Sequence, residues 1–246
     1  MAHAHPAHEG PEVYFQYESL DQQQESYTLG MWAFLVTEVM FFGALFLIYT
    51  LYRMKFHEDF FLAHEQLNWK MGGLNTVILL TSSMTVAMAV HFAQKGKKKL
   101  QLAMLAVTLA CAGGFLVVKT WEYGAKGDHH LYPNWTFSYG HEEGKEHKVD
   151  SWWDKTLPSF LHIEKKEMHG NPERAKLFFS IYFTLTGLHG LHVVIGIIAI
   201  TSLMILIIRN SSLITDYVPT ELVGLYWHFV DLVWIFLYPL LYLIPR

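Results

Sequence analysis

Five long runs of apolar residues, separated by shorter polar stretches, dominate the chain. A helix needs about 20 consecutive apolar residues to cross a hydrocarbon core of roughly 30 Å, and each run is about that long or longer. The fourth run exceeds what one span needs, so its helix is expected to tilt or to project beyond the membrane. The pattern predicts an all-α polytopic membrane protein, a bundle of five transmembrane helices. The expected spans are 29–52, 74–92, 100–123, 177–208 and 222–243.

The polar stretches divide the chain into a tail and a membrane domain. Residues 1–28 contain no lysine, arginine or apolar core, which predicts a polar N-terminal tail and not a cleaved secretory signal. The membrane domain is expected over 29–246, with a long extramembrane loop at 124–176 between the third and fourth spans. Composition agrees, since 52% of the 246 residues are hydrophobic and 16% are charged. The single cysteine, Cys111, leaves no partner for an intrachain disulfide.

Basic residues near the span ends predict the orientation. The short loop between the second and third spans, KGKKK at 95–99, is the densest basic cluster of the chain. The loop 124–176 holds more basic residues in total, but they are mixed with acids, and long loops translocate with less regard to charge. The short loop therefore places the N-terminus in the cytoplasm and the C-terminus in the periplasm.

The last span carries ionisable residues into the hydrocarbon. Glu221, Gly224, His228 and Asp231 recur at spacings of three, four and three residues, so they share one helix face. This row fits a structural network, in which Asp231 and His228 satisfy each other or a neighbouring helix. It fits a ligand or proton site as well, and the spacing leaves both open.

The fourth span repeats this pattern with histidine and glycine. His189 and His192 lie three residues apart, and Gly187, Gly190 and Gly196 are expected to let another helix approach closely. Histidine is a common axial ligand of haem, so His189, His192 and His228 could ligate one between facing helices. Packed, hydrogen-bonded imidazoles are the alternative.

The first three spans hold fewer polar groups. Glu38 lies near the middle of the first span, where a carboxylic acid can donate a hydrogen bond across a helix interface or relay a proton. Asn75 and Thr76 of the second span are expected to make contacts between helices. In the third span Lys119 and Glu122 are three residues apart, so they are expected to pair near an interface, with Lys119 snorkelling outward.

Five motifs together resemble one family. TEVMFFGALF with Glu38, LNTVILLTSSMT with Asn75 and Thr76, WEYG with Glu122, TGLHGLHVVIG and YWHFVDLVWIFLY are similar to successive helices of subunit III of haem–copper cytochrome c oxidases. The resemblance follows the same order along the chain and covers all five spans. It is to the short bacterial type, because the larger members have seven spans.

The resemblance implies a redox-silent supporting subunit in a proton-translocating terminal oxidase of aerobic respiration. No catalytic residue, haem or metal is expected in this chain; haem and copper belong to the partner subunits I and II of the electron transport complex in the bacterial inner membrane. Glu38 matches the embedded acid of the family, with Thr37 where serine is usual. Larger members hold lipid in a cleft formed by their first two spans, which this chain lacks, so a bound phospholipid is left open.

The loop 124–176 departs from the family because it is far longer than usual. Trp135, Trp152 and Trp153 and the adjacent charges suggest a surface for docking another respiratory subunit or complex, because tryptophan is enriched at interfaces. A solvated loop is the alternative.

Two functional hypotheses follow. In the first, the chain is a non-redox subunit of a cytochrome c oxidase, packing on subunit I and sustaining proton uptake, with a quinol oxidase subunit as a variant. In the second, it is a self-contained membrane cytochrome that binds haem through its membrane histidines. The absence of nucleotide-binding and serine-hydrolase motifs and of a basic arm gives other functional classes no support.

Overall fold

The computed structural model describes residues 13, 15–128, 171–209 and 216–243 of the chain. Six helices form this part: α1 (Leu20–Lys55), α2 (His57–His64), α3 (Trp69–Gln94), α4 (Lys98–Asp128), α6 (Pro172–Ile208) and α7 (Val218–Tyr242). Five of them, all except α2, are long and apolar enough to cross a membrane. The predicted all-α fold with five spans is therefore confirmed, and the described residues contain no strand.

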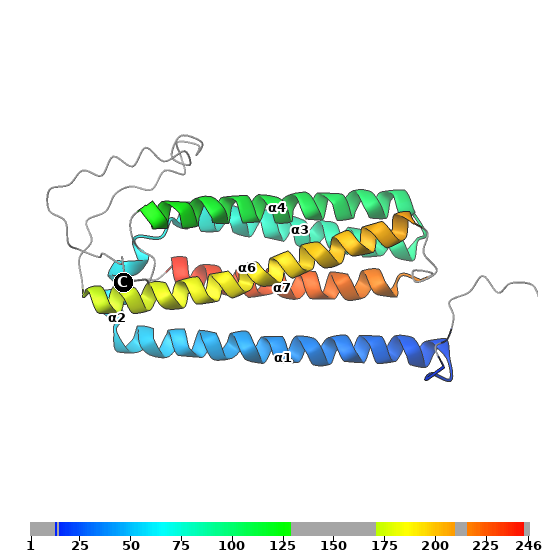
Figure 1. Ribbon diagram of the computed structural model, residues 1–246, viewed down its shortest axis with the longest axis horizontal. Helices are drawn as coiled ribbons and strands as arrows, with labels where there is room; N and C mark the ends of the chain where they lie inside the picture. The colour runs from blue at the N-terminus through cyan, green and yellow to red at the C-terminus, as the bar shows by residue number, and fades with distance from the viewer. Residues whose placement is uncertain (1–12, 14, 129–170, 210–215, 244–246) are drawn as a thin grey trace, which may run out of the picture.

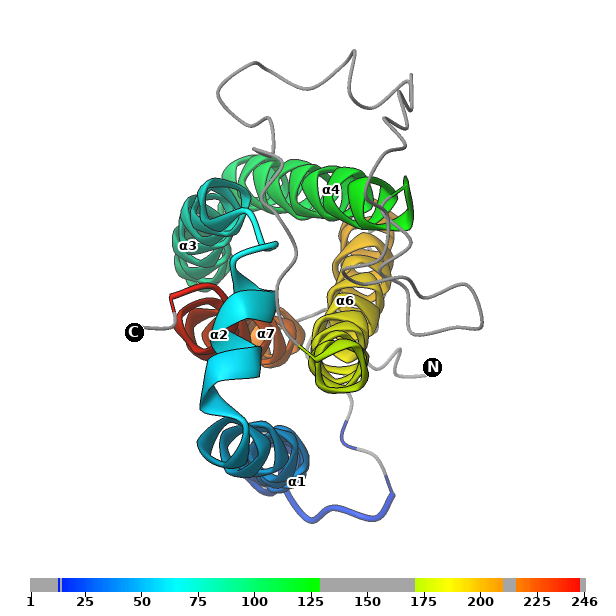
Figure 2. The same ribbon diagram turned by 90° about the vertical axis from the view of Figure 1, so that its left-hand side faces the viewer.

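The five long helices run side by side along the long axis of the molecule (Figure 1). Seen from the end, α3, α4, α6 and α7 group together, α1 lies beyond α7, and the short helix α2 crosses the end of the bundle (Figure 2). Helix α7 contacts α3, α6 and α1. Its central place explains why half of its most apolar window is buried, against 11% for α1.

Local sequence signals set the helix ends. Asn68 caps α3 by accepting hydrogen bonds from the backbone N–H groups of Lys70 and Met71. Asn171 caps α6 in the same way, with proline at the first helical position. Gly96 adopts a φ of 67° after α3, a left-handed conformation that glycine accepts readily, and it makes the tight turn into α4.

Each of the five long helices begins before the run from which it was predicted, and α1 extends furthest. Helix α1 begins at Leu20, so residues 20–28, expected in the polar tail, continue the helix. The 37 residues of α6 correspond to roughly 55 Å at about 1.5 Å per residue, more than the hydrocarbon core requires. Helix α2 packs against the Pro172 end of α6.

The core is aromatic and centres on α7. Trp227 and Trp234 of this helix are fully buried. At Gly196 of α6, an added Cβ would lie 2.6 Å from the ring of Trp227, so this glycine allows the two helices to approach. Helix α1 instead leaves many large apolar side chains exposed, as a surface in lipid or against another subunit would.

Candidate functional site

The polar groups inside the bundle form one dense cluster and several smaller sites. The cluster surrounds Glu122 of α4, which is completely buried. Its carboxylate accepts hydrogen bonds from Lys119 Nζ at 2.8 Å and from Lys126 Nζ at 2.7 Å, one helical turn away on either side. Two tyrosines from other helices complete it, with Tyr182 Oη at 2.9 Å and Tyr242 Oη at 2.5 Å.

The expected Lys119–Glu122 pair is therefore present, but its setting differs from the prediction. Lys119 does not snorkel outward; it is 7% exposed and also donates to Tyr242 Oη at 2.8 Å. Lys126 is the functional candidate that sequence reasoning missed, although its spacing of four residues from Glu122 is a helix-pair signal. Tyr182 and Tyr242 lie far away in sequence and gave no such signal.

A second site joins α1 to α6 through Glu38 and His192. Glu38 Oε2 lies 3.1 Å from His192 Nε2, and both side chains are mostly buried. His192 Nδ1 lies 2.7 Å from the carbonyl oxygen of Leu188, which can only accept, so Nδ1 carries a proton. The contact at Nε2 then needs one further proton, held either by the acid or by the imidazole. Glu38 and His192 therefore share a proton at the α1–α6 contact.

The row on α7 does not act as one network. His228 Nδ1 lies 2.7 Å from Ser83 Oγ of α3, and it does not bond Asp231. Asp231 is 2% exposed, and neither of its oxygens makes a hydrogen bond of normal geometry among the described residues, although the Ser83 hydroxyl lies close enough to interact with its carboxyl group. Gly224 is buried against Val90, whereas Glu221 is only partly buried. The face predicted as a single polar stripe is therefore divided among different neighbours.

The three membrane histidines are not brought to one site. His189 is fully buried between the rings of Phe115 and Trp234, and its ring nitrogens have no partner in the described part of the chain. His192 faces Glu38 and His228 faces Ser83. Within the described ranges, no three histidine, cysteine, aspartate or glutamate side chains gather in a way that could hold a metal ion. The haem-ligand set considered from the sequence is thus not assembled.

The residues expected to pack helices take several roles. Thr76 Oγ1 accepts a hydrogen bond from Trp234 Nε1 at 3.1 Å, linking α3 to α7. Its neighbour Asn75 is fully buried, and its amide has no partner among the described residues. Close helix approach occurs at Gly196, but a Cβ added to Gly187 or Gly190 would meet no atom within 4 Å. Those two glycines make no close helix contact within the described chain.

The expected docking residues Trp135, Trp152 and Trp153 lie outside the described residues. The described residues contain hydrogen-bond networks, one proton shared between Glu38 and His192, and buried ionisable groups. It is therefore suited to structural support and proton handling.

Comparisons with known proteins find similarity to subunit 3 of respiratory oxidases. Residues 173–245, which include His189, His192, His228 and Asp231, match the family model described as cytochrome c oxidase subunit III. The chain is 29% identical to a probable quinol oxidase subunit 3 of Staphylococcus saprophyticus, over 88% of both chains. It is 28% identical to cytochrome c oxidase subunit 3 of Bacillus sp. (strain PS3), over 87% of this chain and 84% of the relative. It is also 28% identical to cytochrome bo(3) ubiquinol oxidase subunit 3 of Pseudomonas putida, over 88% and 84%.

Proposed function

The chain belongs to the haem–copper oxidase subunit III family, bacterial type, as a multi-pass subunit of a terminal oxidase, and on that premise we propose that it is a non-redox supporting subunit. In this proposal it packs against the catalytic subunit I, sustains proton uptake while oxygen is reduced and leaves haem and copper to subunits I and II. The Glu38–His192 pair carries the proposal, because it holds a shared proton at a mostly buried helix contact.

The surface of α1 supports packing against another subunit. Trp32, Met40 and Leu47 are 54%, 71% and 60% exposed along this helix, and only 11% of its most apolar window is buried. Such a face suits lipid or a neighbouring membrane protein. Since Glu38 lies on the same helix, a partner bound to α1 would be close to the shared proton.

We keep the bacterial cytoplasmic membrane, with a cytoplasmic N-terminus, as the proposed location and orientation. The start of α1 and the basic turn between α3 and α4 lie at the same end of the bundle (Figure 1). The positive-inside rule would place that end in the cytoplasm. Labelling of a cysteine introduced at Lys97 from the periplasmic side of intact cells would contradict this orientation.

Cytochrome c is the proposed electron donor. The sequence basis is the TEV setting of Glu38, which is similar to the cytochrome c branch of the family. Relatives named for quinol and for cytochrome c oxidases differ by one percentage point in identity, 29% against 28%, so identity does not separate the donors. Oxidation of reduced cytochrome c by the purified oxidase supports the proposal, whereas activity with quinol alone contradicts it.

Deletion of the subunit is the main test. The oxidase would be purified with and without this chain, and its haem and copper content and turnover would be compared. We expect equal haem and copper per subunit I, and an activity that fails sooner during sustained turnover without the chain. Haem lost in proportion to this chain would instead support the membrane-cytochrome hypothesis.

The loop at 124–176 is proposed to dock another respiratory subunit or complex through Trp135, Trp152 and Trp153. Deletion of residues 127–168 should leave the oxidase assembled but reduce co-purification of such a partner. Unchanged co-purification would show that the loop has no docking role.

A further inference from the structure

The cluster around Glu122 contains more positive than negative charge. Lys119 and Lys126 both donate to the carboxylate of Glu122, and in the described part of the chain no second carboxylate bonds either lysine. A buried charge without a counter-charge is strongly unfavourable in a medium of low polarity. The imbalance therefore points to an anion beside the cluster.

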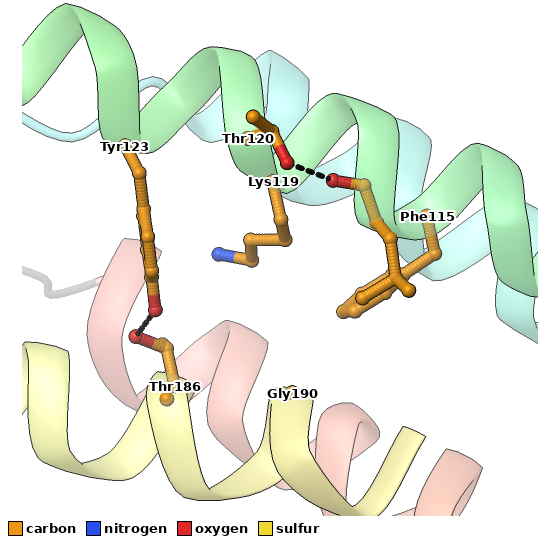
Figure 3. Close-up of a pocket in the computed structure, with 8 residues that line it drawn as sticks. Phe115, Lys119, Thr120, Tyr123, Thr186 and Gly190 are labelled. Atoms are coloured by element: carbon orange, nitrogen blue, oxygen red, sulfur yellow. Dashed lines mark hydrogen bonds between the residues drawn. The ribbon is translucent and has the colours of Figure 1, made fainter. Parts of the chain in front are cut away.

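A cavity of about 160 Å³ lies between α4 and α6, next to this cluster. The side chain of Lys119 extends into the space between the two helices, with Tyr123 on one side and Phe115 on the other (Figure 3). The inner wall is buried at Lys119 and Thr186, whereas the rim is exposed at Thr120 and Gly187. The cavity thus opens on the outer surface of the bundle, and a ligand can enter it from outside.

One hydrogen-bond donor in this cavity is available to a ligand. A lysine ammonium has three N–H groups, and Lys119 uses one toward Glu122 and one toward Tyr242. The hydroxyls nearby are engaged with each other or with the backbone: Thr186 donates to the carbonyl of Tyr182 and accepts from Tyr123 at 2.6 Å. The ammonium also lies 4.5 Å from the centroid of the Trp234 ring, and Lys119 is the one charged residue among the described residues that line the cavity.

The surroundings of the cavity are those of a membrane surface. Val117 and Leu191, which neighbour the rim along α4 and α6, are 49% and 54% exposed. Lys119 directly follows the uncharged run 100–118, which is long enough to cross the hydrocarbon core. A bilayer that covers this run would place its lipid headgroups near the end of α4 that carries Lys119.

The α6 side of the cavity is open because it is built from glycine. A Cβ added at Gly187 or Gly190 would meet nothing within 4 Å. On the opposite side Phe115 and Leu116 provide an apolar wall toward the bilayer centre. An acyl chain can therefore lie along these residues while its headgroup remains beside Lys119.

We propose that the cavity between α4 and α6 binds an anionic phospholipid, whose phosphate accepts a hydrogen bond from Lys119. Charge complementarity selects this occupant, since the cluster has an excess cation and the rim faces lipid. The site is distinct from the cleft that larger family members form with two additional spans. It depends neither on the electron donor nor on the shared proton at Glu38.

The test uses the purified oxidase complex, washed in detergent to remove lipid and then supplied with phosphatidylglycerol, phosphatidylcholine or inorganic phosphate. Three versions would be compared: wild type, Lys119→Met and Gly187→Leu. Gly187→Leu fills the mouth of the cavity without changing the charge cluster, so it keeps the test decisive if Lys119→Met fails to assemble. Gly113→Leu on α4 is the matched control, because that glycine also has open space around it.

We expect phosphatidylglycerol to raise the thermal unfolding midpoint of the wild type and of Gly113→Leu. In Lys119→Met and Gly187→Leu, the concentration needed for half of this effect should rise at least tenfold. Mass spectrometry should find one fewer retained phosphatidylglycerol per complex in these two variants. Equal responses in all versions, or an equal effect of phosphatidylcholine, would overturn the proposal. Stabilisation by inorganic phosphate alone would identify a free anion site and overturn it too.

Discussion

Glu122 and Asp231 are carboxyl groups buried in the same bundle, yet their surroundings are opposite. Glu122 accepts hydrogen bonds from two lysines and two tyrosines, at 2.5 to 2.9 Å. Asp231 is 2% exposed and makes no hydrogen bond of normal geometry among the described residues, where only the Ser83 hydroxyl interacts with its carboxyl group. Burial alone therefore does not define the role of an acid in the membrane. The hydrogen-bond donors around the carboxyl group determine whether its removal lowers or raises the stability of the protein.

Removal of the well-supported acid should have the largest effect. Glu122→Gln leaves two buried ammonium groups without their carboxylate, and breaking such an arrangement typically costs about 3–5 kcal/mol. We expect the thermal unfolding midpoint of the purified oxidase to fall and this subunit to dissociate first. The measurement is thermal unfolding of the complex, followed by the fraction of subunit retained.

Glu221→Gln is the matched control for that variant. It also removes one carboxylate from a membrane helix, but Glu221 is only partly buried and no described side chain bonds it. Its stability should stay close to that of the wild type. If Glu122→Gln were equally harmless, the cluster would be dispensable for stability.

Removal of the unsupported acid should have the opposite sign. Asp231→Leu replaces a buried acid that makes no well-formed hydrogen bond among the described residues with an apolar side chain, which removes a poorly satisfied polar group worth about 1–3 kcal/mol. We expect a stability gain of roughly 1–2 kcal/mol, less than the full value because the larger leucine side chain must fit into a packed site. Asp231→Asn is the control, because it keeps an unsatisfied polar group and should give no such gain. A clear loss in Asp231→Leu would mean that the assembled oxidase supplies a partner for the acid.

The same contrast explains how far sequence alone could go. The spans were predictable because each is a long apolar run, and the Lys119–Glu122 pair because it lies within one helical turn. Lys126 was equally accessible to the spacing rule and was missed. By contrast, Tyr182 and Tyr242 reach Glu122 through contacts 60 and 120 residues away in the chain. No local pattern encodes such contacts.

Two further sites show the same limit. The Glu38–His192 contact joins residues 154 positions apart, so the sequence could identify each as unusual but not as partners. The helical row of Glu221, His228 and Asp231 was correctly spaced to share a face, but α7 is surrounded on several sides, and that face meets more than one neighbour. Periodicity predicts which residues share a face; it does not predict what the face contacts.

Glu38 is the intermediate case, since its carboxyl group contacts one partner among the described residues, His192, and is partly accessible. Glu38→Gln removes the shared proton but can still hydrogen-bond His192, so we expect a stability loss of only about 0.5–1.5 kcal/mol and intact assembly. The active life of the oxidase at high turnover should shorten. The measurement is the number of turnovers completed before activity falls to half.

The neighbouring substitution Thr37→Val is a suitable control for Glu38→Gln. Thr37 is exposed, and its hydroxyl bonds only the carbonyl of Phe34 in its own helix. Endurance like that of the wild type in Glu38→Gln would reduce the acid to a packing role. If the oxidase with Thr37→Val also had a short active life, the cause would be the changed surface of α1 and not the loss of the proton between Glu38 and His192.

The smallest loss of stability is expected on replacing Asp59, which forms an ion pair with Arg174 outside the five long helices' apolar runs. Asp59 of α2 accepts a hydrogen bond from Arg174 at 2.7 Å; the Arg174 side chain is 46% exposed and that of Asp59 14%. Burial raises the pKa of Asp59, but the hydrogen bonds from Arg174 and from the Asn171 backbone, with the charge of Arg174, lower it further, so the net pKa is below its usual value. Exposed pairs of this kind contribute about 0.2–1 kcal/mol, and Asp59→Asn should lose no more than that at pH 7.

The pH dependence of Asp59→Asn identifies the cause of that loss. Because the pKa of Asp59 is lower in the folded state, its ionised form stabilises that state fully at pH values above the pKa of the unfolded state, about 3.9. This stabilisation disappears as the pH falls through the lower pKa of the folded state. The stability difference between wild type and variant should therefore be constant from about pH 5 to 8 and shrink below about pH 4. Added salt should reduce it too, because solvent screens this pair. A difference that changed between pH 5 and 8 would mean that another group titrates with the pair. Glu122, which is fully buried, should show no such salt sensitivity, which would complete the contrast between a buried acid and a partly accessible one.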